Sequence, residues 1–377
     1  MTKVESGSKR MGRAREAAIA VAEKGLLPDR LVRMGIRRLL AERLAELRTD
    51  DEAFTEATRR EFFRAAYALP VAVATREANE QHYEVPAAFY EKVLGARFKY
   101  SCCDYGLRAE RPGQPLPLPD LEQAEETMLA RTCERARIED GMRILDLGCG
   151  WGSLSLWLAE HYPNAEILAV SNSKTQREHI VARADRAGLT NLRVRTADAN
   201  HFDPSSELGD SASSKFDRVV SIEMFEHMRG WPALFERISS WLAPDGRLFL
   251  HYFCHRTTPY YFEVRNESDW MSKYFFTGGI MPSYDLAAQF PEHLAVEESY
   301  HVDGRHYERT CNDWLARLDA RRDEIMPIMA ETYGEADAAM WLTCWRFFFM
   351  ACAELFGHRS GSEWFVAHHR LAPTRGR

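Results

Sequence analysis

RILDLGCGWG, residues 143–152, is the stretch that decides the fold of this chain. It begins with a short apolar run of the kind found in buried strands, interrupted near its end by Asp146. Three glycines follow at alternate positions, Gly148, Gly150 and Gly152, and residues 153–161 then read as a helix. A strand that ends in a glycine-rich turn and enters a helix is how a doubly wound α/β sheet meets a nucleotide. Glycine has no Cβ, so a ligand can approach this backbone closely.

The spacing of the glycines narrows the choice of ligand class. A dinucleotide fingerprint has the spacing G-x-G-x-x-G and places a pyrophosphate on the helix end. Here the spacing is G-x-G-x-G, and an acid stands on the strand before it. This suits a ligand with an amino-acid tail, a nucleoside and no phosphate, such as S-adenosylmethionine (SAM), whose ammonium can pair with Asp146. From this point the chain resembles a class I SAM-dependent methyltransferase.

Composition excludes several classes of protein. The chain has 377 residues and a net charge of −7, which argues against nucleic acid as the main partner. Its eight cysteines contain no C-x-x-C pair, so no metal site and no disulfide framework is expected. The chain carries no signal-peptide pattern and no uncharged apolar run near the ~20 residues of a membrane span. These features predict a cytoplasmic protein.

The N-terminal part reads as helical over residues 13–80. In the segment Leu31–Leu47 apolar residues recur at helical spacing, and four arginines of the segment, with Arg48 just after it, lie on the other side. The segment is either a membrane-surface helix or, as the simpler interpretation, a helix packed on the core with a solvated basic face. Residues 79–105, which precede the nucleotide-binding part, are rich in aromatic, hydroxyl and thiol side chains. They form either a packed loop over the sheet edge or a lid over the cofactor.

Strands and helices then alternate, which predicts a parallel, doubly wound sheet. After the strand at 143–147 we expect strands at 167–170, 192–196, 216–221 and 247–251, with helices at 176–187 and 231–242. After residue 251 this alternation stops. An aromatic-rich segment (255–284) precedes a strand at 294–300, helices at 312–330 and 338–356, and a last strand at 364–368. The predicted division is a helical region (1–95), a SAM-binding Rossmann-like core (96–255), and a helical, aromatic cap with the final strands (256–377).

The candidate site residues fall where the strands end, because ligands of doubly wound sheets lie beyond the carboxyl ends of the strands. Strand two ends in Ser171 and Asn172 instead of an acid, so neutral groups must hold the ribose. Glu223 and His227 stand four apart, and would share a face if this segment turned helically. With Glu226 they form a candidate site for proton handling.

Longer motifs extend the resemblance. LDLGCGWGSLSLWLAE, SNSKTQREHI and EMFEHM resemble the cyclopropane fatty acid synthase family of SAM-dependent enzymes. HYFCHRTTPYYFE, DWMSKYFFTGGIMPS, GRHYERT and WRFFFMACAELFG resemble its coclaurine N-methyltransferase branch, whose members methylate the nitrogen of benzylisoquinoline alkaloids. The resemblance covers nearly the whole chain.

The resemblance also implies roles for individual residues. Around SAM it implies the lid residues Tyr100 and Ser101, the turn glycines Gly148 and Gly150, Ser171 and Gln176 near the ribose, and Asp198 at the adenine edge. For catalysis it implies Glu223, Glu226 and His227. Cyclopropane synthases typically have glycine in place of Glu223 and hold a bicarbonate base, and their bicarbonate positions match Cys102, Glu226, His251 and Tyr307. This chain keeps all four of these bicarbonate-binding side chains, so the sequence does not exclude lipid chemistry.

The sequence thus predicts a SAM-dependent N-methyltransferase for a small aromatic or heterocyclic amine. The alternative enzyme is a cyclopropane-fatty-acyl-phospholipid synthase or a lipid C-methyltransferase, and only that alternative makes membrane lipid a partner. A non-catalytic SAM-binding protein is the third hypothesis. No nucleic acid is expected, and a homodimer is left open.

Overall fold

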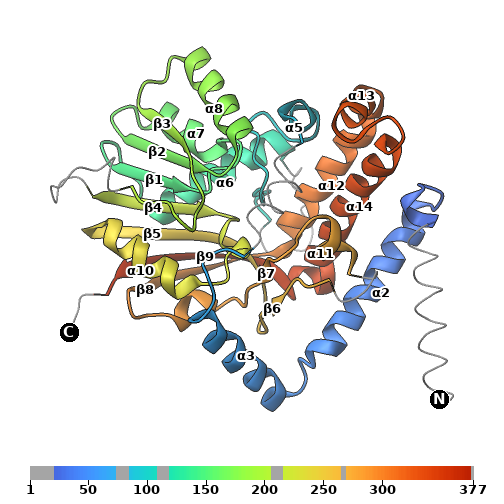
Figure 1. The fold of residues 1–377 in the computed structure, drawn as a ribbon, viewed down its shortest axis with the longest axis horizontal. Helices are drawn as coiled ribbons and strands as arrows, with labels where there is room; N and C mark the ends of the chain where they lie inside the picture. Colours follow the sequence, from blue (N-terminus) through green and yellow to red (C-terminus); the bar gives the residue numbers. More distant parts are fainter. Residues whose placement is uncertain (1–20, 74–84, 108–118, 205–214, 265–268, 375–377) are drawn as a thin grey trace, which may run out of the picture.

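A seven-stranded mixed sheet forms the centre of the computed structural model, which describes residues 21–73, 85–107, 119–204, 215–264 and 269–374 (Figure 1). The strand order is β3-β2-β1-β4-β5-β9-β8. The strands are β1 (Arg143–Leu147), β2 (Glu166–Ser171), β3 (Leu192–Thr196), β4 (Phe216–Ile222), β5 (Leu242–His255), β8 (Leu294–Val302) and β9 (Trp364–Pro373). A small second sheet pairs β6 (Tyr260–Tyr261) with β7 (Ile280–Met281).

The predicted strands are all present, but the sheet is not wholly parallel. Strands β1 to β5 run parallel, as expected. The last strand, β9, enters between β5 and β8 and pairs antiparallel with both. The prediction of a parallel sheet rested on the alternating part of the chain and is confirmed there. It gave no direction for the final strands, because a strand that follows a long helical segment can enter the sheet in either direction. β5 is also longer than predicted and begins at Leu242.

Alternating side chains of the parallel strands point to opposite faces of the sheet and pack into two hydrophobic cores. Ile144, Ile167 and Val220 pack against α6 (Leu121–Ala136) and α7 (Ser153–His161) on one face. On the other face, Leu145 and Val219 pack against α10 (Trp231–Trp241) and α3 (Glu52–Ala66). A strand buried on both faces reads as a continuous apolar run, which explains why the sequence marked these strands clearly. The helix α8 (Lys174–Ala187) begins where Ser173 accepts a hydrogen bond from the main-chain N–H of Gln176 (3.3 Å).

A helical cap lies beside the carboxyl edge of the sheet (Figure 1). It contains α5 (Ala87–Val93), α12 (Gly304–Ala320), α13 (Arg322–Tyr333) and α14 (Ala338–Gly357). The single helix expected over 312–330 was wrong. The chain turns at Arg321, which has ψ of 24°, so two helices form, and the first of them already begins at Gly304. The remaining short elements are η2 (Phe225–His227), α11 (Trp270–Tyr274), η3 (Leu286–Gln289) and η4 (His358–Gly361).

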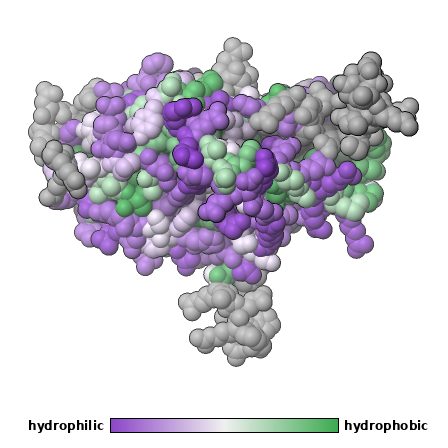
Figure 2. Space-filling model, turned by 90° about the horizontal axis from the view of Figure 1, so that it is seen from below, coloured by the Kyte–Doolittle hydropathy of each residue, from purple (hydrophilic) through white to green (hydrophobic). Residues whose placement is uncertain are grey.

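The basic helix α2 (Asp29–Leu47) packs against α14. Arg33 and Arg37 both pair with Glu354 of α14, at 2.9 and 2.5 Å. These contacts agree with the simpler interpretation, a helix packed on the core. α14 is long and apolar enough to cross a membrane, but half of it is buried against the other helices. Figure 2 shows a described surface that is mostly hydrophilic, with hydrophobic residues in separate groups.

Candidate functional site

The glycine-rich turn after β1 forms one wall of a cavity at the carboxyl edge of the sheet. The main-chain N–H groups of Gly148 and Cys149 both donate to the carbonyl oxygen of Val170, at 2.9 Å. Gly148 has φ of +85°, and a Cβ there would lie 2.5 Å from Cγ of Met224. Glycine is therefore required both by the backbone conformation and by the close approach of the segment after β4.

Most of the predicted cofactor residues meet around this turn. Two connected hollows share Gly148, Gly150, Gln176, Glu223 and His227. Among the other predicted cofactor residues, Tyr100, Ser101 and Asp146 line the first hollow, and Ser171 and Asn172 line the second. Asp198 lines neither of them. Its Oδ1 accepts a hydrogen bond from the main-chain N–H of Asn200 (2.8 Å), so its contact with an adenine edge stays a prediction.

Three polar atoms in the wall fit a ligand rich in acceptors and hydroxyls. Trp151 Nε1, Ser153 Oγ and Gln176 Nε2 are buried and have no hydrogen-bond partner among the described residues. All three residues line the cavity. Buried polar groups are normally paired, and unpaired ones in a cavity point to a bound molecule. SAM carries a carboxylate, ribose hydroxyls and adenine nitrogens, which match these groups.

Asp146 is held inside the cavity wall at the end of β1. It is 1% exposed, and its Oδ2 accepts a hydrogen bond from Ser155 Oγ at 2.5 Å. Burial raises its pKa to about 6, although the bond from Ser155 works in the opposite direction. A carboxylate in this position is ready to pair with a ligand ammonium, because such a pair would offset the penalty of burying its charge.

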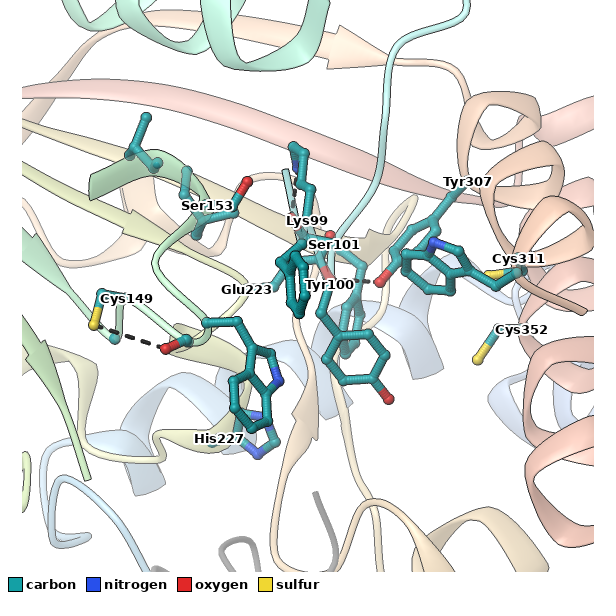
Figure 3. A pocket seen from close by; sticks show the side chains of 18 of the residues that line it. Lys99, Tyr100, Ser101, Cys149, Ser153, Glu223, His227, Tyr307, Cys311 and Cys352 are labelled. Atoms are coloured by element: carbon teal, nitrogen blue, oxygen red, sulfur yellow. Dashed lines mark hydrogen bonds between the residues drawn. The ribbon is translucent and has the colours of Figure 1, made fainter. Parts of the chain in front are cut away.

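Glu223 is the most heavily bonded side chain of the cavity. Its carboxylate accepts hydrogen bonds from the main-chain N–H of Cys102 (2.9 Å), from His251 Nε2 (3.1 Å) and from the Tyr307 hydroxyl (2.5 Å). Figure 3 shows the Tyr307 hydroxyl pointing toward Glu223. Three of the four groups that the resemblance assigned to a bicarbonate, all but Glu226, thus bind a carboxylate of the chain itself.

The backbone of Glu223 is in the left-handed region, with φ of +48°. A residue with a Cβ adopts this conformation at a cost of about 1–2 kcal/mol. Hydrogen bonds to a charged group contribute about 1.5–3 kcal/mol each, so the bonds from Cys102, His251 and Tyr307 offset the strain. The structure therefore holds Glu223 in a conformation that glycine would adopt without strain, and uses it to point a carboxylate into the cavity.

His227 reaches the same cavity from η2. Its ring packs against Phe276, with centroids 4.5 Å apart. Glu223 and His227 were expected to share a helical face, yet the helical turn begins only at Phe225. Both side chains line the cavity nevertheless, because the left-handed turn at Glu223 redirects the chain.

Glu226 takes a different position from its two neighbours. It is fully buried and is not among the residues that line the cavity. Its Oε1 accepts a hydrogen bond from the main-chain N–H of Phe253 (2.7 Å). Burial, and then the charge of Glu223, raise the pKa of Glu226 well above its usual range. Burial and the neighbouring charge thus both disfavour the ionised form of Glu226, and its direct contact with a substrate stays a prediction.

Aromatic rings close the far side of the cavity. They come from β5, from the segment that follows it, and from the helices of the cap: Phe253, Phe262, Phe276, Trp314, Phe348 and Phe356. Sequence analysis marked the aromatic segments 255–284 and 338–356, but could not select these rings, because most of their neighbours are core. Figure 3 shows Cys311 and Cys352 on the helices at this end.

The lid carries a residue that the sequence analysis missed. Lys99 is 3% exposed and donates to Ser101 Oγ (2.5 Å) and to the carbonyl oxygen of Cys102 (2.7 Å). Lys99, Tyr100 and Ser101 all line the cavity, so this part of the segment 79–105 forms part of the cavity wall, and its role as a lid stays a prediction. Residues 79–84 of the segment lie outside the described residues.

Comparisons with known proteins agree with this architecture. The family profile described as mycolic acid cyclopropane synthetase matches residues 72–363. The chain is 33% identical to (S)-coclaurine N-methyltransferase of Thalictrum flavum subsp. glaucum over 353 residues, which is 92% of each chain. It is 29% identical to the cyclopropane-fatty-acyl-phospholipid synthase of Escherichia coli strain K12, over 78% of this chain and 67% of that protein.

A solved structure is similar over almost the whole length. It is a coclaurine N-methyltransferase bound to N-methylheliamine and SAH, with a TM-score of 0.86 and 33% identity. The match covers 95% of this chain and 99% of the other. The N-terminal helices, the sheet and the cap of this chain therefore have counterparts in one known fold.

Proposed function

Because this chain belongs to the mycolic acid cyclopropane synthetase family of SAM-dependent methyltransferases, we propose that it methylates the nitrogen of a small aromatic or heterocyclic amine. One observation carries the proposal: the carboxylate of Glu223 lines the same cavity as His227 and a set of aromatic rings. A carboxylate attracts a cationic amine and can accept its proton. Aromatic faces can hold the same cation.

The need for a base follows from the chemistry of the acceptor. An aliphatic amine with a pKa near 10 is mostly protonated at pH 7, and reaching its neutral form costs about 4 kcal/mol. Glu223 would accept the ammonium proton, with His227 orienting the nitrogen. The freed lone pair then forms the new N–C bond. SAM supplies an electrophilic methyl group on a sulfonium, which becomes a neutral thioether.

The residues around the turn would hold the cofactor. Asp146 would pair with its ammonium, and Ser171, Asn172 and Gln176 offer neutral groups for the ribose. Tyr100 and Ser101 would cover it from the lid and limit the access of water. Each of these assignments is supported by the position of the side chain in the cavity wall.

A fatty-acyl cyclopropane synthase is the second candidate, favoured by the similarity to the Escherichia coli enzyme. Such an enzyme would hold its bicarbonate base at Cys102, Glu226, His251 and Tyr307. In this chain all of these groups except Glu226 already bind Glu223, and a bicarbonate would have to displace that carboxylate. This contact supports amine methylation over lipid chemistry.

A methylation screen separates the two candidates. The enzyme is incubated with SAM and a library of aromatic and heterocyclic amines, with phospholipid vesicles containing unsaturated chains in a parallel well. Mass spectrometry should find amines heavier by one methyl group and unchanged lipid. Cyclopropanated lipid without any amine turnover would overturn the proposal.

A further inference from the structure

Two buried histidines connect Glu223 to an arginine of α6, the helix that packs on the same face of the sheet as His251. His251 Nε2 contacts Glu223 Oε1 at 3.1 Å, and His251 Nδ1 contacts His368 Nε2 at 2.9 Å. His368 Nδ1 in turn contacts Arg135 NH1 at 2.8 Å. The four side chains form one hydrogen-bonded array from the cavity to the last turn of α6.

The fold sets the geometry of this array. His251 on β5 and His368 on β9 are direct cross-strand partners, and they are 1% and 0% exposed. A cation–π contact fixes the position of Arg135, because its guanidinium lies 4.3 Å from the centre of the Tyr300 ring on β8. The array therefore depends on the antiparallel insertion of β9, which sequence analysis did not predict.

The guanidinium fixes the direction of every hydrogen bond in the array. A guanidinium has only donors and stays protonated, so His368 Nδ1 must accept. The proton of a neutral His368 then lies on Nε2 and is donated to His251 Nδ1. His251 in turn carries its proton on Nε2 and donates it to Glu223.

We propose that Arg135 and His368 are positioning residues that keep His251 a neutral hydrogen-bond donor, so that Glu223 retains its full negative charge for a cationic substrate. The proposal rests on the proposed function, in which Glu223 takes the proton of an amine. A histidine beside a carboxylate would otherwise gain a proton and form an ion pair. Such a pair has no net charge, and its carboxylate is a weaker base.

The surroundings of His251 support a neutral ring. Burial lowers its pKa, and Lys99 and Arg135 act in the same direction, against the hydrogen bond and charge of Glu223. Burial, then His251, Arg135 and Lys99, lower the pKa of His368 well below its usual value. The two cations thus oppose a third positive charge between them. If His251 gained a second proton on Nδ1, a neutral His368 would have to carry its own proton on Nδ1, and the Arg135 donor already occupies that nitrogen.

The test compares variants that lack the hydrogen-bond donor of Arg135, at the end of the array, with variants that keep a donor there. Arg135→Met removes the donor and leaves an apolar side chain of similar length, whereas Arg135→Lys retains a donor. Within β9, His368→Leu breaks the array, and His368→Gln keeps both an acceptor and a donor. His369→Gln is the matched control, because His369 points to the opposite face and contacts the carbonyl oxygen of Tyr284.

Two measurements are made on each full-length variant. Long-range 1H–15N correlation of histidine rings should show His251 neutral and protonated on Nε2 in the wild type near pH 7, with its signals assigned by their loss in His251→Gln. In Arg135→Met and His368→Leu the ring should gain a second proton. For the best amine found, kcat/KM should fall about tenfold or more in these two variants, with unchanged SAM affinity. Arg135→Lys and His368→Gln should recover most of it.

The outcomes separate this proposal from the proposed function. A doubly protonated His251 in the wild type would overturn the array, as would Arg135→Met and His368→Leu variants with unchanged ring signals and unchanged kcat/KM. An equal loss in His369→Gln would show that kcat/KM reports only damage to β9, and would also overturn the array. If Glu223→Gln left amine turnover intact, the proposed function would fail, although the protonation of His251 would still be read from the spectra.

Discussion

The main-chain N–H of Cys102 on the lid donates to the carboxylate of Glu223, at the end of β4, over 2.9 Å. This bond joins the covering segment to the candidate catalytic residue. The next amide of the lid, Cys103, donates instead to Thr310 Oγ1 on α12, over 3.1 Å. Neighbouring amides of one segment therefore report separately on the catalytic carboxylate and on the cap.

Amide hydrogen exchange can measure the protection of Cys102 and Cys103 separately. In Glu223→Ala the amide of Cys102 loses its acceptor, so it should exchange faster, while that of Cys103 stays protected. If this segment is a lid over the cofactor, SAM should slow exchange across residues 98–105 in the wild type. The measurement is residue-resolved exchange by mass spectrometry. Equal rates with and without SAM would reduce the segment to an ordinary packed loop.

Substitution of a turn glycine should abolish cofactor binding. Gly148→Val places a side chain against Met224 at a positive φ, so SAM binding should be lost in isothermal titration while the far-UV spectrum is kept. Gly188→Ala is the control. Gly188 also has a positive φ (+66°), a Cβ there meets no described atom within 4 Å, and the residue lines neither hollow. Unchanged affinity in Gly148→Val would place the cofactor elsewhere.

Asp146 should make SAM affinity depend on pH. Its pKa in the folded protein is about 6, and an ammonium binds the ionised form, so affinity should fall as the pH drops below 6, approaching tenfold per unit. Binding near pH 6 should also release a proton. Titrations at pH 5.5 and 7.5 in two buffers measure both effects. Asp146→Asn should bind more weakly and lose this pH dependence, and a wild-type affinity that is flat across the range would contradict the pairing.

The same residue affects stability in a defined direction. The folded pKa of Asp146 lies above the usual value of 3.8, so the protonated form is favoured by folding. The contribution of this group is most favourable below pH 4 and is lost as the pH rises through 6. Asp146→Asn should therefore gain stability relative to the wild type between these values, measured by thermal unfolding without SAM.

The proton-handling pair is tested by rate against pH. Glu223→Gln and His227→Ala should lower kcat by roughly 10²–10⁴-fold at neutral pH and leave SAM binding nearly intact. The deficit should shrink toward the pKa of the amine, because solvent then supplies the neutral nucleophile. Glu226→Gln should cost less than Glu223→Gln, because Glu226 is buried outside the cavity wall, where its ionised form is disfavoured. A deficit that is independent of pH would leave positioning as the only role of the pair.

Much of the core could be predicted because its signals are local. β1 and β3 begin and end near the predicted residues, and α7 coincides with its prediction at Ser153 and His161. Apolar runs, glycines and caps are encoded within a few residues. The direction of β9 is not encoded in this way, since it depends on how the cap returns the chain to the sheet. The break at Arg321 was hidden because both sides of it have helical patterns.

In the candidate site, too, the residues marked by a local sequence signal were predicted and their distant partners were not. Glu223 and His227 are close in sequence, and their position after a strand marked them. The partners of Glu223 were named only through a resemblance, and Lys99, Arg135 and His368 were missed. Arg135 and His368 come from α6 and β9, more than 200 residues apart in the chain. Only the folded sheet brings them together.

The place of β9 in the sheet also has a consequence for synthesis. Leu371 pairs with Leu248 on one side and with Val296 on the other, so β9 fills a gap between two strands that leave the ribosome before it. Until β9 is made, the edges of β5 and β8 have no partner, and open edges invite pairing with other chains. Contacts this distant in sequence also form slowly. We expect nascent chains that stop before residue 364 to bind chaperones or aggregate, and release from this state to coincide with the arrival of the final strand.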